Sequence, residues 1–314
     1  MLLMLIWCIQ PAAAQIAPIV PFSDAAAETI TTTTDKRQRL TVPVRLEDSG
    51  PWRFLIDTAA QRTLLSSELA TELSLEAESK AKIVALAGST TVATVYIPEL
   101  TLGSRTTGGI IAPTFAAAAM GADGILGLDS LQQQRILFDF LKQEIRVEDS
   151  RSAVADRSDR EIVVTARRRS GQLIFTEATI AGNAVSVIID TGGELSIGNL
   201  ALQRKLRLRP GVAQKIDLVD ITGRSVPADI AAVADLRIDR ARFSQLPIAF
   251  ADIAPFRVLK LLKRPALFLG MDALRQFDRI VIDFANRKIR FLLPEDAPVV
   301  DLAGNAPDMV YSIP

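Results

Sequence analysis

Two segments of the sequence repeat each other, and this repeat constrains the possible fold more than any other feature. The first segment reads FLIDTAAQ at residues 54–61, and the second reads VIIDTGGE at residues 187–194. In each, an apolar run typical of a buried strand leads into Asp-Thr and two small residues, and an amphipathic segment typical of a helix follows. Self-similarity of this kind indicates that one structural unit occurs twice.

A second pair of motifs follows in the same order. Residues 125–129 read ILGLD and residues 268–272 read FLGMD, and a short helical segment and a strand ending in Asp-Phe come after each. Gly127 follows Asp57 by 70 positions, and Gly270 follows Asp190 by 80, while the two aspartates are 133 positions apart. Two motifs in one order at similar spacing predict a duplicated domain, with an insertion of about ten residues in the second copy.

Most of the remaining sequence is strand-like. Apolar residues alternate or run continuously, with Gly, Asn or Ser at the turns, in residues 39–47, 81–97, 173–182 and 280–293. Hairpins are predicted to turn near Gly88 and Gly223, and the helical segments are few and short. The predicted fold class is therefore mainly β, as two similar β-barrel lobes with a few short helices.

Two absent or scarce residue types exclude several chemistries. The 314 residues include no histidine and one cysteine, Cys8. Ser-His-Asp and Cys-His catalysis are thereby excluded, and no disulfide can form within the chain. Lysine plus arginine equals aspartate plus glutamate, at 36 each, so nothing suggests attraction to nucleic acid or anionic lipid. We predict no cofactor and no metal.

The first 14 residues have the pattern of a secretory signal peptide. An apolar run is followed by Pro11 and by the small residues 12–14, so cleavage is expected after Ala14. The run is too short to span a membrane as a helix. Lipid attachment at Cys8 is an alternative, which the bulky Trp7 before it disfavours. The pattern predicts a periplasmic or secreted protein.

Polar and low-complexity stretches divide the rest of the chain. The predicted organisation is a signal peptide (1–14), a flexible lead-in (15–37), lobe 1 (38–148), a linker with a joining strand (149–169), lobe 2 (170–294) and a tail (295–314).

The matched position of two aspartates changes the interpretation of each. A single aspartate at a strand end usually accepts backbone hydrogen bonds and is structural. Asp57 and Asp190 together favour two carboxyl groups that face each other and share one proton, because like charges so close cannot both ionise. The ionised member can activate a water and the protonated member can polarise a carbonyl group, without histidine, cysteine or metal.

The other repeated aspartates are expected to be structural. Asp129 and Asp272 precede short helical segments, which predicts that they are helix N-caps. Asp139 and Asp283 end strands before turns, where a carboxylate commonly accepts backbone hydrogen bonds.

The paired motifs resemble those of the aspartic proteases, and the short lobes resemble most the bacterial retropepsin-like family, here in a tandem, two-lobe form. The resemblance covers roughly residues 38–148 and 170–294. It implies two acid-protease-like lobes and an aspartic endopeptidase with Asp57 and Asp190 as its catalytic dyad. It also implies that Thr58 and Thr191 hydrogen-bond across the junction of the lobes.

The resemblance assigns further roles. Ala59 and Gly192 would let the backbone pass close to the substrate, and the segments with Gly127 and Gly270 would pack beneath the aspartate loops. The two predicted hairpins would be flaps that close over a peptide or protein substrate bound as an extended strand.

The first motif departs from the family pattern, which has Asp-Thr-Gly, at Ala59. A positive φ at this position would make the methyl group cost about 1 kcal/mol or more, whereas a negative φ would make it nearly harmless. The departure leaves an alternative function, a catalytically inactive peptide-binding module on the same scaffold. Each lobe could also pair with its twin in another chain, although a linker of about 20 residues favours a monomer with both lobes paired within one chain.

Overall fold

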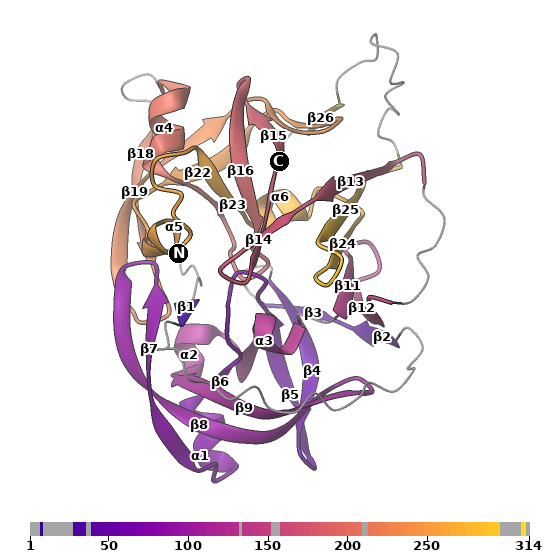
Figure 1. Cartoon of the computed structure of the whole chain (residues 1–314), viewed down its shortest axis with the longest axis vertical. Helices are drawn as coiled ribbons and strands as arrows, with labels where there is room; N and C mark the ends of the chain where they lie inside the picture. The colour runs from indigo at the N-terminus through magenta and orange to yellow at the C-terminus, as the bar shows by residue number, and fades with distance from the viewer. Residues whose placement is uncertain are drawn as a thin grey trace.

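Two lobes and a third, shared sheet make up the fold. The computed structural model describes residues 7–8, 28–35, 39–131, 134–151, 158–208, 213–295 and 309–311. Figure 1 shows lobe 1, in indigo to magenta, below lobe 2, in pink to orange, with the third sheet at their side. The fold is mainly β and duplicated, as predicted.

Lobe 1 is built on a nine-stranded sheet in the order β1-β7-β8-β9-β6-β10-β5-β4-β3. The strands are β1 (Trp7–Cys8), β3 (Thr33–Thr34), β4 (Leu40–Leu46), β5 (Ser49–Ile56), β6 (Leu64–Ser66), β7 (Ala77–Ala85), β8 (Gly88–Leu102), β9 (Arg105–Phe115) and β10 (Gly124–Leu126). In β4 the apolar residues Val42 and Val44 are buried and Pro43 between them is exposed, the alternation that predicts a strand. β10 runs parallel to β5, with Leu126 beside Ile56, and so lies next to the strand that leads into Asp57.

Lobe 2 repeats this plan in an eleven-stranded sheet. The order is β18-β19-β22-β17-β23-β16-β15-β20-β21-β26, and β14 pairs with β15. The strands are β14 (Arg167–Arg169), β15 (Gln172–Ile180), β16 (Asn183–Ile189), β17 (Ser196–Gly198), β18 (Gln214–Val219), β19 (Ser225–Val233), β20 (Leu236–Ile238), β21 (Ala241–Phe243), β22 (Leu246–Phe250), β23 (Ala266–Leu269) and β26 (Met309–Tyr311). β23 runs parallel to β16 as β10 does to β5, with Leu269 beside Ile189.

Six short helices in the described residues occur in matching order in the two lobes. They are α1 (Ser67–Glu72), α2 (Ala117–Met120) and α3 (Leu128–Leu131) in lobe 1, and α4 (Leu200–Leu206), α5 (Ala254–Val258) and α6 (Met271–Leu274) in lobe 2. α1 starts where Ser66 Oγ accepts the Leu69 N–H at 3.0 Å, and α4 where Asn199 Oδ1 accepts the Leu202 N–H at 2.8 Å. Within the described ranges, no helix has the length and apolar character needed to cross a bilayer.

The third sheet joins the two lobes through strands from both. Its order is β13-β25-β24-β11-β12-β2, and its strands are β2 (Glu28–Thr31), β11 (Gln134–Asp139), β12 (Glu144–Asp149), β13 (Glu161–Thr165), β24 (Arg279–Asp283) and β25 (Lys288–Leu292). At its centre β11 of lobe 1 pairs antiparallel with β24 of lobe 2. The sequence assigned these two strands to separate lobes, and pairing across the lobes was not predicted.

Reciprocal ion pairs reinforce this central pairing. Arg135 Nε lies 3.3 Å from Asp283 Oδ2, and Arg279 Nε lies 2.7 Å from Asp139 Oδ2. Each aspartate also accepts a backbone N–H three residues later, from Lys142 to Asp139 at 3.0 Å and from Asn286 to Asp283 at 2.9 Å. Their predicted role at the turns is therefore confirmed, with an ion pair across the lobes added to it.

The predicted flexible lead-in, 15–37, is wrong over its last part. β2 pairs with β12, placing Ile30 opposite Ile145, and Ile30 is buried. The β-branched threonines of residues 28–31 favour a strand, and this strand can pair with the free edge of β12. Glu28 lies 133 positions before Glu161, the start of β13, so β2 and β13 are twins and the repeated unit begins ten residues before the predicted boundary.

The two ends of the chain add strands to the lobes. β1 pairs antiparallel with β7, and β26 pairs parallel with β21 in the segment predicted to be a tail. The predicted cleavage site after Ala14 and most of the predicted signal peptide lie outside the described residues. The main hydrophobic core runs through both lobes into the third sheet, where Phe277 packs against Phe291 of β25 with ring centres 4.8 Å apart and ring planes tilted by 39°.

Candidate active site

Asp57 and Asp190 occupy equivalent places at the ends of two buried strands. Asp57 follows β5, and its N–H donates to Leu126 of β10 at 3.0 Å. Asp190 follows β16, and its N–H donates to Leu269 of β23 at 3.0 Å. Both side chains are fully buried. The parallel strand beside each one therefore fixes the point at which the carboxyl group leaves the sheet.

In each carboxyl group, one oxygen accepts backbone hydrogen bonds, and the other oxygen has no hydrogen-bond partner among the described residues. Asp57 Oδ1 accepts the N–H groups of Ala59 at 2.8 Å and Ala60 at 2.9 Å. Asp190 Oδ1 accepts those of Gly192 at 3.1 Å and Gly193 at 2.9 Å. Oδ2 of each aspartate is buried and has no hydrogen-bond partner among the described residues. A buried carboxylate oxygen without a partner is rare outside functional sites.

The two carboxyl groups come from different lobes and lie near each other at the junction. A methyl group built on Gly192 would lie 2.3 Å from both Cγ and Oδ2 of Asp57, so the lobe 2 loop passes directly against the lobe 1 carboxyl group. The negative charge of Asp57 also raises the pKa of Asp190. These two observations place the aspartates in one site.

Burial dominates the electrostatics of this pair. Loss of hydration raises the pKa of Asp57 to about 7, against the lowering effect of the Ala59 and Ala60 N–H groups and of the Arg39 charge. Burial and then the charge of Asp57 raise the pKa of Asp190 well above its usual value. Arg39 is fully buried, and Gln172, which lies 133 positions later, is a neutral residue. The two halves of the site are thus chemically unequal.

Thr58 and Thr191 bind each other across the lobes, as the resemblance implied. Thr58 Oγ1 donates to Ile189 O at 2.8 Å and accepts the Thr191 N–H at 3.2 Å. Thr191 Oγ1 donates to Ile56 O at 2.8 Å and accepts the Thr58 N–H at 3.1 Å. Because each hydroxyl group uses both its donor and its acceptor capacity, the two aspartate loops are locked together.

Ala59 fits its position without backbone strain. It is not among the described non-glycine residues with a positive φ, and Gly192 is not among the glycines with one. The Ala59 side chain is buried in a cluster that includes Ile188 of lobe 2, and its carbonyl group accepts a hydrogen bond from Gln172 Nε2 at 2.8 Å. The departure from the family pattern is therefore accommodated by packing.

Gly127 and Gly270 lie directly beneath the aspartate loops, as predicted. A methyl group on Gly127 would lie 2.3 Å from the backbone carbon of Arg62, and one on Gly270 would lie 2.7 Å from that of Leu195. No side chain larger than hydrogen fits at either position without moving backbone. The glycines thus set the close packing that supports each loop.

Asp129 and Asp272 support the aspartate loops through hydrogen bonds that were not predicted. Asp129 Oδ1 accepts the N–H and Oγ1 groups of Thr63 at 2.8 and 2.7 Å. Asp272 accepts the N–H of Ser196 at 3.1 Å and its Oγ at 2.7 Å. The predicted N-cap role is wrong, because both aspartates lie in the first turn of α3 and α6, and Gly270 is the N-cap of α6. A hydroxyl residue six positions after each of Asp57 and Asp190 was the available signal.

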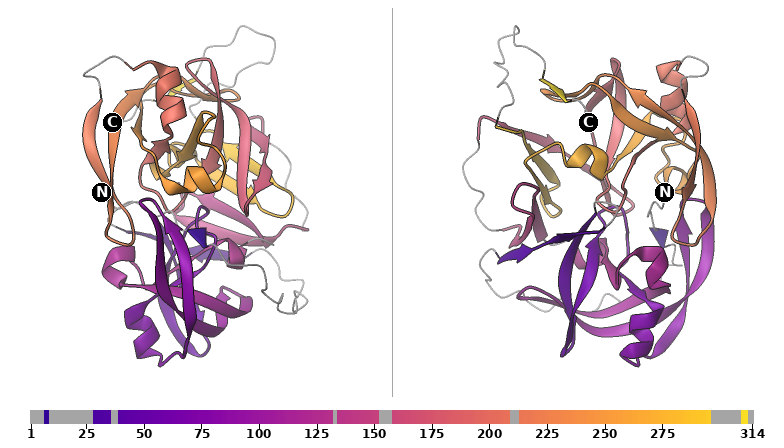
Figure 2. Two further views of the ribbon diagram at one scale, coloured as in Figure 1. Left: turned by 60° about the vertical axis from the view of Figure 1, so that its left-hand side comes forward. Right: turned by 180° about the vertical axis from the view of Figure 1, so that it is seen from behind.

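Two hairpins meet at the mouth of the site. The β7–β8 hairpin, called flap 1, and the β18–β19 hairpin, called flap 2, approach each other tip to tip in Figure 1 and in both views of Figure 2. Leu86 at the tip of flap 1 is buried in the same cluster as Ala59. Ile221 at the tip of flap 2 is buried in a cluster with Leu55 and Ile125 of lobe 1. The predicted hairpins are confirmed, and each tip packs against the opposite lobe.

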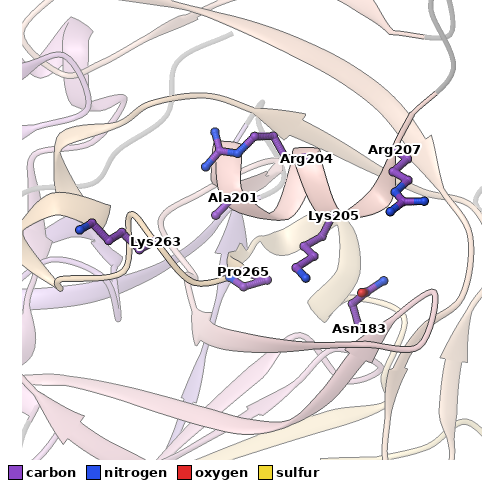
Figure 3. Close-up of a pocket in the computed structure, with 7 residues that line it drawn as sticks. All are labelled: Asn183, Ala201, Arg204, Lys205, Arg207, Lys263 and Pro265. Atoms are coloured by element: carbon purple, nitrogen blue, oxygen red, sulfur yellow. The ribbon is translucent and has the colours of Figure 1, made fainter.

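A surface cavity on lobe 2 is unrelated to this site. Figure 3 shows it lined by Asn183, Ala201, Arg204, Lys205, Arg207, Lys263 and Pro265. Arg204 and Lys263 extend to one side and Lys205 and Arg207 to the other, so the four cations do not converge on one point. In the described part of the chain, no group of three or more histidine, cysteine, aspartate or glutamate side chains is arranged to hold a metal ion.

Comparison with protein families agrees with this geometry. Residues 42–133 match the model of a gag-polyprotein putative aspartyl protease, and residues 176–273 match that of an aspartyl protease. Each match contains one aspartate of the pair, and together they cover more than half of the chain. The chain therefore belongs to the retropepsin-like aspartic protease family, with two protease domains in tandem. A comparison with curated proteins gave no match.

Proposed function

We propose that the protein is an aspartic endopeptidase, with Asp57 and Asp190 as its catalytic dyad. One observation carries the proposal: the loop that carries one fully buried carboxyl group packs directly against the other, and each carboxyl group has one oxygen without a hydrogen-bond partner among the described residues. The paired threonines hold both groups in place. This is the arrangement needed for one shared proton.

The different charges around Asp57 and Asp190 assign their roles as base and acid. The Arg39 charge lowers the pKa of Asp57, whereas the Asp57 charge raises the pKa of Asp190, so Asp57 is assigned as the ionised base and Asp190 as the group that keeps the proton. The water oxygen attacks the carbonyl carbon of the peptide as its proton passes to Asp57. The proton of Asp190 passes to the carbonyl oxygen. Asp57 then donates its proton to the amide nitrogen, the C–N bond breaks, and a hydroxyl group of the tetrahedral intermediate returns its proton to Asp190 as the new carboxyl group forms.

The substrate is a peptide segment in extended conformation. β1 of the chain itself supports this mode, since Trp7 and Cys8 pair antiparallel with Val84 and Ile83 beside the tip of flap 1. The edge of β7, which β1 occupies in this structure, can therefore accept a strand through backbone hydrogen bonds. The site is flanked by apolar clusters that include Leu86 and Ile221, which favours apolar side chains in the bound segment.

The test is peptide hydrolysis by three versions of the full chain. Wild type should cleave a mixture of unstructured peptides, with new ends detected by mass spectrometry, and Asp57→Asn and Asp190→Asn should each lose at least about a thousandfold of that rate. Asp48→Asn, at an exposed turn, is the matched control and should cleave as wild type does. Binding of peptides without cleavage at any pH would instead support the inactive peptide-binding alternative.

Both carboxyl groups lie in one chain, which supports an active monomer. Specific activity that stays constant on dilution would agree with this, whereas activity that falls with the square of concentration would point to pairing between chains. The periplasmic or secreted location stays a prediction from the sequence, and fractionation of cells that express the full chain would test it.

A further inference from the structure

We propose that Asp220 is a positioning residue that latches flap 2 to flap 1 over the dyad and so controls when a peptide can reach it. The proposal rests on the proposed function for its consequence in catalysis. The latch itself concerns only the two hairpin tips, so it can be tested on a chain with or without activity.

Asp220 uses its two carboxylate oxygens for different purposes. Oδ1 builds the turn of flap 2, because it accepts the Thr222 N–H at 2.9 Å and the Arg224 N–H at 3.3 Å. Oδ2 reaches across to flap 1 and accepts the Ala87 N–H at 3.0 Å. The side chain is fully buried, although it lies at the tip of a hairpin. A carboxylate that accepts backbone N–H groups in such a place makes strong hydrogen bonds.

Two further contacts secure the same meeting point. Arg224 Nη2 donates to Gly88 O at 3.2 Å, a second bond from flap 2 to flap 1. The carbonyl group of Leu86 accepts the Ala254 N–H at 2.9 Å, which attaches flap 1 to α5 of lobe 2. α5 lies in the longer second copy, between β22 and β23.

The two flaps contribute different groups to the latch. In the hydrogen bonds described between the two tips, flap 2 contributes the side chains of Asp220 and Arg224, and flap 1 contributes the backbone of Ala87 and Gly88. With the latch in place, Asp57 and Asp190 are fully buried. A peptide can reach the dyad only after the tips separate, so the strength of the latch sets the fraction of molecules that are open.

Asp220→Asn separates the two functions of this side chain. Asparagine keeps an acceptor oxygen for the turn of flap 2 and places an N–H₂ group, a donor, opposite the Ala87 N–H. We expect hydrogen exchange at residues 85–88 and 220–224 to become about tenfold faster, which corresponds to about 1.4 kcal/mol of opening free energy. Exchange in β5, β16 and the third sheet should stay unchanged.

Asp229→Asn is the matched control. Asp229 lies at the base of flap 2, where it accepts a hydrogen bond from Gln203 Nε2 at 2.8 Å and pairs with Lys215 of the same hairpin. Within the described residues, no hydrogen bond or ion pair joins it to flap 1. It changes the same charge in the same hairpin and should leave exchange at residues 85–88 as in wild type. Arg224→Ala removes the second bond and should speed exchange at the same tips, by a smaller factor.

The outcome is decided by exchange in the substrate-free chain. Unchanged exchange at Ala87 in Asp220→Asn would overturn the latch, as would faster exchange spread evenly over lobe 2. If the chain cleaves peptides, Asp220→Asn should also raise the association rate constant of a cleaved peptide about tenfold. A merely structural defect would lower the amount of active protein and leave that rate constant unchanged. If the chain cleaves nothing, the exchange result still stands, so the two proposals can fail separately.

Discussion

Gly192 provides the sharpest test of the site, because its place leaves no room for a single methyl group. The Cβ atom of an alanine would lie 2.3 Å from Asp57 Cγ, whereas ordinary contacts begin at 3.4 Å. The carboxyl group of Asp57 would have to move by about 1 Å, and a displacement of that size at reacting groups can cost about 100-fold in rate. Overpacking should also lower the free energy of unfolding by about 1–3 kcal/mol.

The reverse substitution at Ala59, the position in lobe 1 equivalent to Gly192, should have a small effect on activity. Ala59→Gly removes one buried methyl group, which costs about 0.8 kcal/mol, and adds a glycine entropy penalty of about 0.5–1 kcal/mol. The carboxyl groups need not move, because Asp57 and Ala59 keep their backbone hydrogen bond at 2.8 Å. We therefore expect Ala59→Gly to lose stability and to keep kcat/KM within about threefold of wild type.

The assay compares kcat/KM for one cleaved peptide with unfolding in urea for the same three proteins. Activity should be corrected for the folded fraction, so that a loss of stability is not counted as a loss of catalysis. A Gly192→Ala protein that is folded and retains wild-type kcat/KM would refute the placement of the lobe 2 loop against Asp57. Equal losses in both variants would refute the claimed inequality of the two halves.

Three further predictions follow from other contacts. Thr191→Val should lower the free energy of unfolding by about 2–4 kcal/mol, because it leaves the Thr58 N–H and a carbonyl group buried without partners, while Thr191→Ser should restore most of it in urea unfolding. The rate of hydrolysis should fall as the pH drops below about 7, since burial raises the pKa of Asp57 to about 7 and both carboxyl groups then carry protons; a maximum near pH 4, about the usual carboxyl pKa, would contradict this. Burial raises the pKa of Asp272 to about 6, so its contribution to stability is present below about pH 4 and is lost as the pH rises through 6. Asp272→Asn should therefore flatten the pH dependence of Tm over that range, and an unchanged slope would count against it.

The site could be predicted from the sequence because its chemistry depends on local motifs. Asp57 and Asp190 each follow an apolar strand, and the close backbone packing at Gly127 and Gly270 admits only glycine. Each constraint involves only a few neighbouring residues, and each occurs in both halves of the chain. Because the motif is duplicated, the sequence also indicates that its two copies lie together, which a single copy could not indicate.

The parts that were missed depend on pairing between distant segments. β2 was hidden in a threonine-rich stretch whose composition suggests a flexible linker, and only its pairing with β12 makes it a strand. The alignment of Glu28 with Glu161 at the common offset of 133 was the available signal. The contact of Asp220 with Ala87 carried the same signal, because these two residues are also 133 positions apart and so occupy equivalent places in the two hairpins.

The third sheet joins two halves of one chain whose sequences can accumulate substitutions independently. In an enzyme made of two identical chains, every substitution appears on both sides of the site at once. Here β11 and β24 hold unlike halves together in one chain, so a residue can change on one side while its twin stays fixed. The twin positions Ala59 and Gly192, and likewise Arg39 and Gln172, carry different residues. In a fused chain, lobe 1 can thus hold a positive charge that acts on one aspartate, while lobe 2 supplies the side chains that bind the two flap tips together. The identical halves of a symmetric dimer cannot differ in this way.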